Sequence, residues 1–384
     1  MESRITKQID MCINCYTCTS VCPVFDAWGD EATLTNAPPG FLKGYRYMEQ
    51  WGMEWNTEVL CRALYDCKTC GACEQACAMS LKLTDIVRGL RRASVARSGD
   101  RTSVAGRLGE ALDRIEEHGS PHGPSSWHRG EWAEEADIRV CSKKGHAALV
   151  YFIGCRSDAR SRRIAAVTAR LLQKAGVDFA VLGDAETCCG YVPFSLGADA
   201  LFEALAEKTR HSFRESGVES VLVTSPHCYY VLKHQYGMSK TRPEIHHISR
   251  LLSDLIDTGR LPLTQPVRKV VTYHDPCYLG RHSGIYDAPR AVLRAVPGLE
   301  LVEMEMCREN SLCCGGAGTE EWLSGKLERT IAIRRAKQAV AVGVDVIVTC
   351  CPSCIRMLEE AVDTLRPEKR IAVCDLVEVV EEAL

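Results

Sequence analysis

The chain has 384 residues, of which 46% are hydrophobic and 25% charged, as in ordinary globular domains. Its net charge of −3 gives no reason to expect a nucleic-acid partner. We find neither the basic and apolar start of a secretory signal nor the roughly 18–20 apolar residues of a membrane-spanning helix. We therefore expect a cytoplasmic protein, with any membrane contact made through a partner protein.

Cysteine is the unusual component of this chain, with 22 residues. In a short secreted protein so many thiols would indicate a framework of disulfides. This chain is long, and its cysteines cluster at two-residue intervals. Such clustering favours reduced thiols that bind metal centres.

Residues 1–93 contain two copies of one cysteine pattern, followed by a helical-looking stretch over 84–93. Each copy has the spacing C-x2-C-x2-C-x3-C, which is typical of bacterial ferredoxins with cubane [4Fe–4S] clusters. Three closely spaced thiolates of a copy bind one cube, and the fourth usually reaches the other cube. Structural zinc is the alternative, but zinc sites use two separated pairs of ligands. We therefore assign one cluster to Cys12, Cys15, Cys18 and Cys77, and the other to Cys67, Cys70, Cys73 and Cys22.

Residues 94–146 are polar and contain a single cysteine, so we interpret them as a connector between domains. Apolar residues at helical spacing predict one helix in this segment, over 103–117. The four histidines of the connector could suggest a metal site, but the Gly/Ser-rich composition around them favours a solvated linker.

Residues 147–266 and 267–384 look like two copies of one unit. Each begins with an apolar run that ends in a cysteine, continues through a helical stretch and a Cys-Cys-Gly, and returns to an apolar run before further cysteines. Three cysteines recur at offsets of 122, 125 and 126 residues (155 to 277, 188 to 313 and 228 to 354). Strands that alternate with helices predict parallel α/β units, whose strand ends gather ligand-binding residues on one edge.

The pattern Cys…Cys-Cys-Gly…Cys-x2-Cys resembles the cysteine-rich (CCG) domains of the heterodisulfide reductase family, most closely in YHDPCYLGRHSGIYDAPR and RENSLCCGGAG. The order of the domains is similar to that of its D subunit. It is also similar to iron–sulfur subunits of glycolate, lactate and anaerobic glycerol-3-phosphate dehydrogenases. The resemblance implies an α+β multidomain protein, in which a mostly helical two-cluster ferredoxin domain precedes two duplicated α/β CCG domains.

For the second unit, the resemblance implies a noncubane [4Fe–4S] centre in which some cysteines bridge iron atoms. The ligand set would be complete there, with Cys277, Cys313, Cys314, Cys351 and Cys354, and we expect catalysis at this set. Gly315 would let the backbone turn tightly beside the centre. His274 lies just before the first ligand, where it would tune the potential or deliver protons, unless it only caps the end of the strand.

For the first unit, the resemblance implies a similar site that lacks one thiol. Its candidate ligands are Cys155, Cys188, Cys189 and Cys228, with Gly190 after the cysteine pair. Ser225 stands where another cysteine belongs, and a serine alkoxide binds iron less well than a thiolate. The first site could hold an altered cluster, a conventional one or none, so we expect one or two noncubane centres beside the two cubanes. His227 and Asp275 are further candidates for groups around the centres.

The leading functional hypothesis is an oxidoreductase subunit of heterodisulfide reductase type, in which electrons pass through the cubanes to the second CCG site and reduce a disulfide or similar acceptor. The chain has no G-x-G-x-x-G nicotinamide fingerprint after a strand. The partner would therefore be a flavoprotein, a hydrogenase-type subunit or a quinone-reactive membrane subunit. Two alternatives stay open: the iron–sulfur relay subunit of a flavin-dependent 2-hydroxy-acid or glycerol-3-phosphate dehydrogenase that feeds quinone, and a non-catalytic relay within a bifurcating complex.

Overall fold

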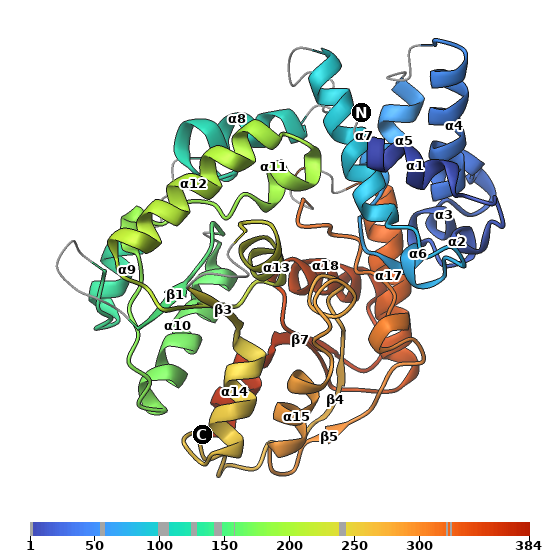
Figure 1. The fold of residues 1–384 in the computed structure, drawn as a ribbon. Coiled ribbons are helices and arrows are strands. Elements are labelled where there is room, and N and C mark those ends of the chain that lie inside the picture. Colours follow the sequence, from blue (N-terminus) through green and yellow to red (C-terminus); the bar gives the residue numbers. More distant parts are fainter. Residues whose placement is uncertain are drawn as a thin grey trace.

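Two parallel β-sheets flanked by helices form the larger part of the fold, and a helical N-terminal part packs beside them (Figure 1). The computed structural model describes residues 3–53, 58–98, 107–123, 129–141, 148–156, 158–237, 243–319, 322 and 325–384. This mixed architecture, helical first and then duplicated α/β, confirms the predicted fold class. Within the described residues, none of the helices combines the length and apolar character that crossing a bilayer requires.

The N-terminal part consists of short helices around the two cysteine motifs. They are α1 (Ser3–Asp10), α2 (Thr17–Ser20), α3 (Pro23–Trp28), α4 (Pro38–Gln50), α5 (Glu58–Asp66), α6 (Ala72–Gln75) and α7 (Leu83–Ser98), with 3-10 turns at Gly29–Glu31 and Leu34–Asn36. The predicted helix over 84–93 is present within α7. Ile86 and Leu90 of α7 are fully buried in one cluster with Ile5 of α1. The two helices can approach because residue 89 is glycine: a Cβ there would lie 2.0 Å from Ile5 Cδ1.

The predicted helix of the connector is present as α8 (Arg107–His118), and a second one, α9 (Arg129–Glu135), follows it. Leu108, Leu112 and Ile115 on α8 are at most 1% exposed and belong to the core of the first sheet. The interpretation of this segment as a solvated linker is therefore wrong for α8, which covers the first α/β unit. His122 packs against the ring of Trp322, whereas His128 and His146 lie outside the described residues.

The first α/β unit contains a parallel sheet in the order β1 (Leu149–Phe152), β2 (Ser220–Val223) and β3 (Glu244–His247). Its helices are α10 (Ala159–Lys174), α11 (Tyr191–Leu196), α12 (Asp199–Glu215), α13 (Pro226–His234) and α14 (Ile248–Asp257), with a 3-10 turn at Gly183–Ala185. The strands are buried at three of four positions in β1 and β2, because helices cover both faces of a parallel sheet.

The second α/β unit repeats this plan with a parallel sheet in the order β5 (Glu300–Leu301), β4 (Val270–Tyr273), β6 (Val346–Thr349) and β7 (Ala372–Asp375). Its helices are α15 (Asp287–Ala295), α17 (Lys326–Ala341), α18 (Pro352–Leu365) and α19 (Leu376–Glu382), with a 3-10 turn at Arg308–Asn310. The predicted apolar runs that precede the cysteine clusters are therefore parallel strands in both units.

The register of the two sheets shows which positions of the units correspond. Leu149 pairs with Ser220 and Ser220 with Glu244, whereas Val271 pairs with Val346 and Val346 with Ala372. Leu149 of the first sheet thus corresponds to Val271 of the second, and Ser220 to Val346. Counted from these strand residues, the cysteines at 155 and 277 are equivalent, and so are those at 228 and 354. The same count places Ser225 at the position of Cys351. The duplication read from cysteine spacing therefore extends to the backbone pairing.

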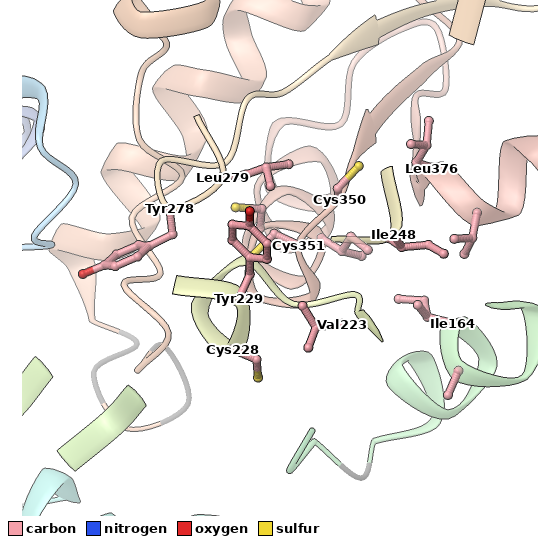
Figure 2. Packing of buried hydrophobic residues seen from close by; sticks show 14 of the residues in the cluster. Ile164, Val223, Cys228, Tyr229, Ile248, Tyr278, Leu279, Cys350, Cys351 and Leu376 are labelled. Atoms are coloured by element: carbon pink, nitrogen blue, oxygen red, sulfur yellow. The ribbon is translucent and has the colours of Figure 1, made fainter. Parts of the chain in front are cut away.

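Both units share one continuous hydrophobic core (Figure 2). Ile248 and Leu376, which follow β3 and β7 at equivalent positions, are fully buried in it, together with Ile164 of α10. Cys228 and Cys351, at the starts of α13 and α18, belong to the same cluster. The ends of the strands that bear the cysteines thus face the interior of the molecule.

His247 gives the first unit a pH-dependent stability that can be measured. This fully buried residue caps α14: its Nδ1 accepts from Ser249 N, and Nε2–H donates to Thr224 O. Burial lowers the pKa of His247 to about 3, below the roughly 6.5 of an unfolded histidine. The stability that neutral His247 gives the first unit is therefore complete above pH 6.5 and is lost as the pH falls toward 3. When the pH is lowered from 7.5 to 5, the free energy of local unfolding should fall by roughly 2 kcal/mol more in the native chain than in His247→Asn.

Hydrogen exchange of the β3 and α14 amides, corrected for intrinsic rates, measures this loss. Asparagine can still cap the helix but cannot take up the proton. His246→Asn on the same strand is the matched control and should keep the native pH dependence, since that side chain is 41% exposed. Equal pH dependence in His247→Asn and the native chain would show that another group is responsible.

Candidate iron–sulfur centres

The two N-terminal cysteine motifs follow the same unusual backbone path. In the first loop Asn14 and Tyr16 have φ values of 57° and 61°, and in the second loop Thr69 and Gly71 have values of 46° and 75°. These residues occupy matching positions on either side of the second cysteine of each motif. A left-handed conformation costs a non-glycine residue about 1–2 kcal/mol. Such shared strain indicates that both loops are shaped to surround the same kind of group.

The structure brings the fourth cysteine of each motif to the loop of the other. Burial, together with the neighbouring thiols Cys12, Cys77 and Cys15, raises the pKa of Cys18 to about 12. Burial also raises the pKa of Cys73, and here the neighbouring thiols are Cys70, Cys67 and Cys22. The thiols therefore gather as the two sets expected from the sequence: Cys12, Cys15, Cys18 and Cys77, and Cys22, Cys67, Cys70 and Cys73.

The two N-terminal sets differ in their access to solvent. The second set lines a small pocket with apolar walls, which include Phe41, Leu83 and Val87. The first set lies nearer the surface, since Cys15 is the exposed one among the described cysteines. The first set is therefore the more accessible of the two to solvent.

The five cysteines of the second CCG unit lie together in the interior. Cys277 follows β4, Cys313 and Cys314 precede Gly315, and Cys351 and Cys354 begin α18. All five are at most 8% exposed, and the Sγ atoms of Cys314 and Cys354 are 3.3 Å apart. Hydrogen bonds from Cys313 and Cys354 lower the pKa of Cys314 well below that of an ordinary thiol. A lowered pKa favours the thiolate, which is the form that binds metals.

Glycine is required after each cysteine pair. Gly315 has a φ of +88°, and a Cβ there would lie 2.7 Å from Glu328 O; Gly190 has a φ of +79°, and a Cβ would lie 2.8 Å from Phe202. The N–H of Gly315 points to Cys313 Sγ at 3.3 Å, and that of Gly190 points to Cys188 Sγ at 3.4 Å. Such N–H groups stabilise negative charge on sulfur. Both glycines thus have the surroundings expected of residues beside a cluster.

His274 lies within the second cysteine set. One of its ring nitrogens and the sulfurs of Cys314 and Cys354 lie within 4.8 Å of one another. Arg335 Nε donates to His274 Nδ1 at 3.0 Å, and His274 is among the groups that lower the pKa of Cys314. A buried nitrogen of this kind is suited to bind or contact a group held by the cysteines.

Asp275 is occupied by a structural ion pair. Arg290 donates to both of its carboxylate oxygens at 2.7 and 2.9 Å, and the backbone N–H of Arg308 donates to Oδ2 at 2.8 Å. Arg290 also binds Glu303 with two hydrogen bonds. This buried network fixes the loop between β4 and Cys277, so Asp275 supports the site from behind.

The first CCG unit keeps a cysteine pocket. Its four thiols (Cys155, Cys188, Cys189 and Cys228) line a pocket together with Ser225, the N-cap residue of α13. Hydrogen bonds from Cys155 and Cys189 lower the pKa of Cys188 well below its ordinary value. The pocket also contains Gly318, Pro352 and Ser353 of the second unit, so it borders both cysteine sets.

Two contacts join the cysteine sets across domains, and spacing along the chain could not predict either. Cys70 of the second N-terminal set lies beside Cys313 of the second CCG set, and each thiol affects the pKa of the other. Burial raises the pKa of Cys351, but Cys354 and His227 of the first unit lower it, so that the pKa lies well below that of an ordinary thiol. The candidate site residue His227 therefore serves the second set, while Cys350 lies apart from the thiol contacts, beside Tyr273.

The donor sets fit iron–sulfur clusters. Each set consists of closely spaced sulfurs, three of the four sets contain a thiol with lowered pKa, and backbone N–H groups point at sulfur in both CCG units. Thiolates are the usual protein ligands of such clusters.

Comparison with known proteins agrees with this assignment. The model of a cysteine-rich domain (CCG) matches residues 149–233 and 271–359, and that of a 4Fe-4S dicluster domain matches residues 8–81. The D subunit of the dihydromethanophenazine:CoB–CoM heterodisulfide reductase of Methanosarcina mazei is 31% identical over 396 residues, which cover 98% of this chain and 94% of that protein. Because the chain contains these domains, it is an iron–sulfur protein.

Two bacterial relatives are longer proteins. A probable iron-sulfur-binding oxidoreductase, FadF, of Bacillus subtilis is 34% identical over 330 residues, and an EtfAB:quinone oxidoreductase of Syntrophomonas wolfei is 33% identical over 336 residues. Each alignment covers 84% of this chain but 46% of the relative. The chain thus spans about half the length of these two proteins.

Proposed function

The chain belongs to the family of CCG-domain iron–sulfur oxidoreductases that includes the D subunit of heterodisulfide reductase, and on this premise we propose that it conducts electrons from a protein partner to a disulfide or similar acceptor at the second CCG site. The acceptor would take two electrons and two protons and leave as two thiols. The partner would be a flavoprotein, a hydrogenase-type subunit or a quinone-reactive membrane subunit.

The proposal assigns the cysteine sets to three or four centres. The two N-terminal sets would hold cubane [4Fe–4S] clusters and the second CCG set a noncubane centre, and a fourth cluster at the first CCG set would have Ser225 in place of a thiolate. When bound, such clusters supply one-electron carriers whose potential depends on charge and hydrogen bonds around the sulfurs. The chain's own residues keep water away from the buried sets and hold their thiolates in place.

One observation supports this order above all: Arg281 ties the second N-terminal set to the five-cysteine set, because it donates to Cys70 O at 2.7 Å and to Ser311 O, two residues before Cys313, at 2.7 Å. The exposed Cys15 lies in the other N-terminal set. The molecule thus has one set near the surface, one buried set after it, and the complete CCG set in contact with the buried one. This succession favours entry of electrons at the first set and delivery at the second CCG site.

The proposal is tested by electron paramagnetic resonance (EPR) of the oxidised protein with added thiols, with 2-mercaptoethanol and cysteine as the first probes. Binding of a thiol sulfur at the second CCG site should produce a new paramagnetic species. A matched sample with ethanol in place of the thiol controls for solvent effects. If no thiol of a broad panel produces a new species, the disulfide chemistry is wrong for this chain.

A relay function is the second candidate, favoured by Ser225 and by the similarity to an EtfAB:quinone oxidoreductase. In this case the CCG sites would pass electrons between a flavin-dependent dehydrogenase and quinone, or within a bifurcating complex, and would not bind thiols. Neighbouring genes for a flavin oxidase-like protein, together with unchanged EPR spectra on thiol addition, would favour the relay.

A further inference from the structure

The loop over residues 67–73, which bears three cysteines of the second N-terminal set, is held by side chains of the second CCG unit. Tyr278 OH lies 2.9 Å from Thr69 Oγ1, and His282 Nε2 lies 2.8 Å from Thr69 O. Lys68 and Glu328 form a buried ion pair across the same boundary. These contacts fix the position of the loop relative to the segment that follows β4.

Arg281 lies at the centre of this boundary. Its Nε donates to Cys70 O at 2.7 Å, and its Nη1 donates to Glu309 O at 3.0 Å and to Ser311 O at 2.7 Å. One guanidinium therefore ties the backbone of a ligand in the loop to the segment that leads to Cys313. Its Nη2 is buried and has no hydrogen-bond partner among the described residues.

The charge around Arg281 comes from both cysteine sets. Burial opposes a charged guanidinium, but the thiolates of Cys70, Cys277 and Cys313 raise its pKa above the ordinary arginine value. A guanidinium has five N–H donors in a fixed plane, and the three hydrogen bonds made here use only those on Nε and Nη1. An anionic sulfur group between these three cysteines would satisfy the buried Nη2.

We propose that Arg281 is a positioning residue for electron transfer from the centre at Cys22, Cys67, Cys70 and Cys73 to the centre at the second CCG site. Its three hydrogen bonds to carbonyl groups fix the two cysteine segments relative to each other, and Nη2–H would donate to a sulfur of a cluster held by the second CCG set. With both clusters bound, one electron would pass from the former to the latter, with no bond made or broken. The positive charge of Arg281 would stabilise the reduced, more negative state of the accepting cluster.

The test compares Arg281→Gln and Arg281→Lys with Arg294→Gln, an exposed arginine on α15 that serves as the control. The iron content and the midpoint potentials of all centres are measured by EPR-monitored redox titration without any substrate. Rapid-freeze EPR after mixing with dithionite then measures how quickly the second CCG centre is reduced. The lysine keeps the positive charge but lacks the planar fork.

We expect full iron content in all three variants. Arg281→Gln should lower the potential of the second CCG centre and slow its reduction about tenfold or more. Arg281→Lys should restore most of the potential but not the rate. If both Arg281 variants match Arg294→Gln in potential and rate, Arg281 does not position the two centres for electron transfer. If either variant loses iron along with the EPR signal, the role of Arg281 is structural.

The inference rests on one part of the proposed function, namely that the second CCG cysteines hold a cluster. A native protein without an EPR signal from that centre would contradict the proposed function itself. A native signal that the Arg281 variants leave unchanged would contradict only the part assigned to Arg281.

Discussion

A Cys314→Ser variant is expected to lose about four irons per chain and all thiol-dependent EPR signals, while the two N-terminal clusters keep theirs. The sulfurs of Cys314 and Cys354 lie 3.3 Å apart, and both residues are almost fully buried. A serine hydroxyl at this place is a poorer ligand for iron than a thiolate. Any disulfide reductase activity should fall at least about a hundredfold, the upper range for damage to a metal site.

The matched control for this variant is Cys350→Ala. Cys350 is buried beside Tyr273, one residue from the proposed ligand Cys351, but it is not a proposed ligand. It should therefore keep the iron and the thiol-dependent signal of the native protein. Full iron and an unchanged thiol response in Cys314→Ser would contradict the assignment of the five-cysteine set.

The second large effect concerns iron removal. Treatment of the native protein with a chelator should unfold residues 3–98 and leave both parallel sheets folded. The small N-terminal core surrounds its cysteines closely, with Cys12, Cys67, Cys73 and Cys77 packed against its buried residues. Where a metal site does not exist in the unfolded chain, binding free energy becomes folding free energy.

Hydrogen-exchange mass spectrometry at increasing chelator concentration measures this order. Protection should disappear first in α1 to α7 and persist in β1 to β3 and β4 to β7, whose strands have a core of their own. Reconstitution with iron and sulfide, which should restore the lost protection, is the control for irreversible damage. Simultaneous loss of protection in all parts would show that the sheets also depend on iron.

The sequence predicted local features well because cysteine spacing and apolar runs report on neighbouring residues. It predicted the two N-terminal motifs, the parallel strands before the cysteines and the correspondence of Ser225 with Cys351, which the sheet register reproduces. It did not predict that α8 would be buried. The amphipathic pattern of α8 predicted a helix, but the polar residues on both sides of it gave no sign that its apolar face packs on the first α/β unit.

Contacts between distant segments could not be predicted from the spacing of the cysteines along the chain. The Cys70–Cys313 contact, the approach of His227 to Cys351 and the position of Arg281 depend on how three domains pack together. No repeat or period in the chain encodes such packing. His227 and His274 could be suspected because each lies close to a cysteine, yet only the structure shows that both face the same set.

The iron and acid-labile sulfide content of anaerobically purified protein tests the central claim most directly. Two cubanes and one or two four-iron CCG centres predict about twelve to sixteen irons per chain, with similar amounts of sulfide. A value near sixteen would mean that the Ser225 site is filled, and a value near twelve that only the second CCG site is. About eight irons per chain would mean that both CCG sites are empty, which would contradict the account.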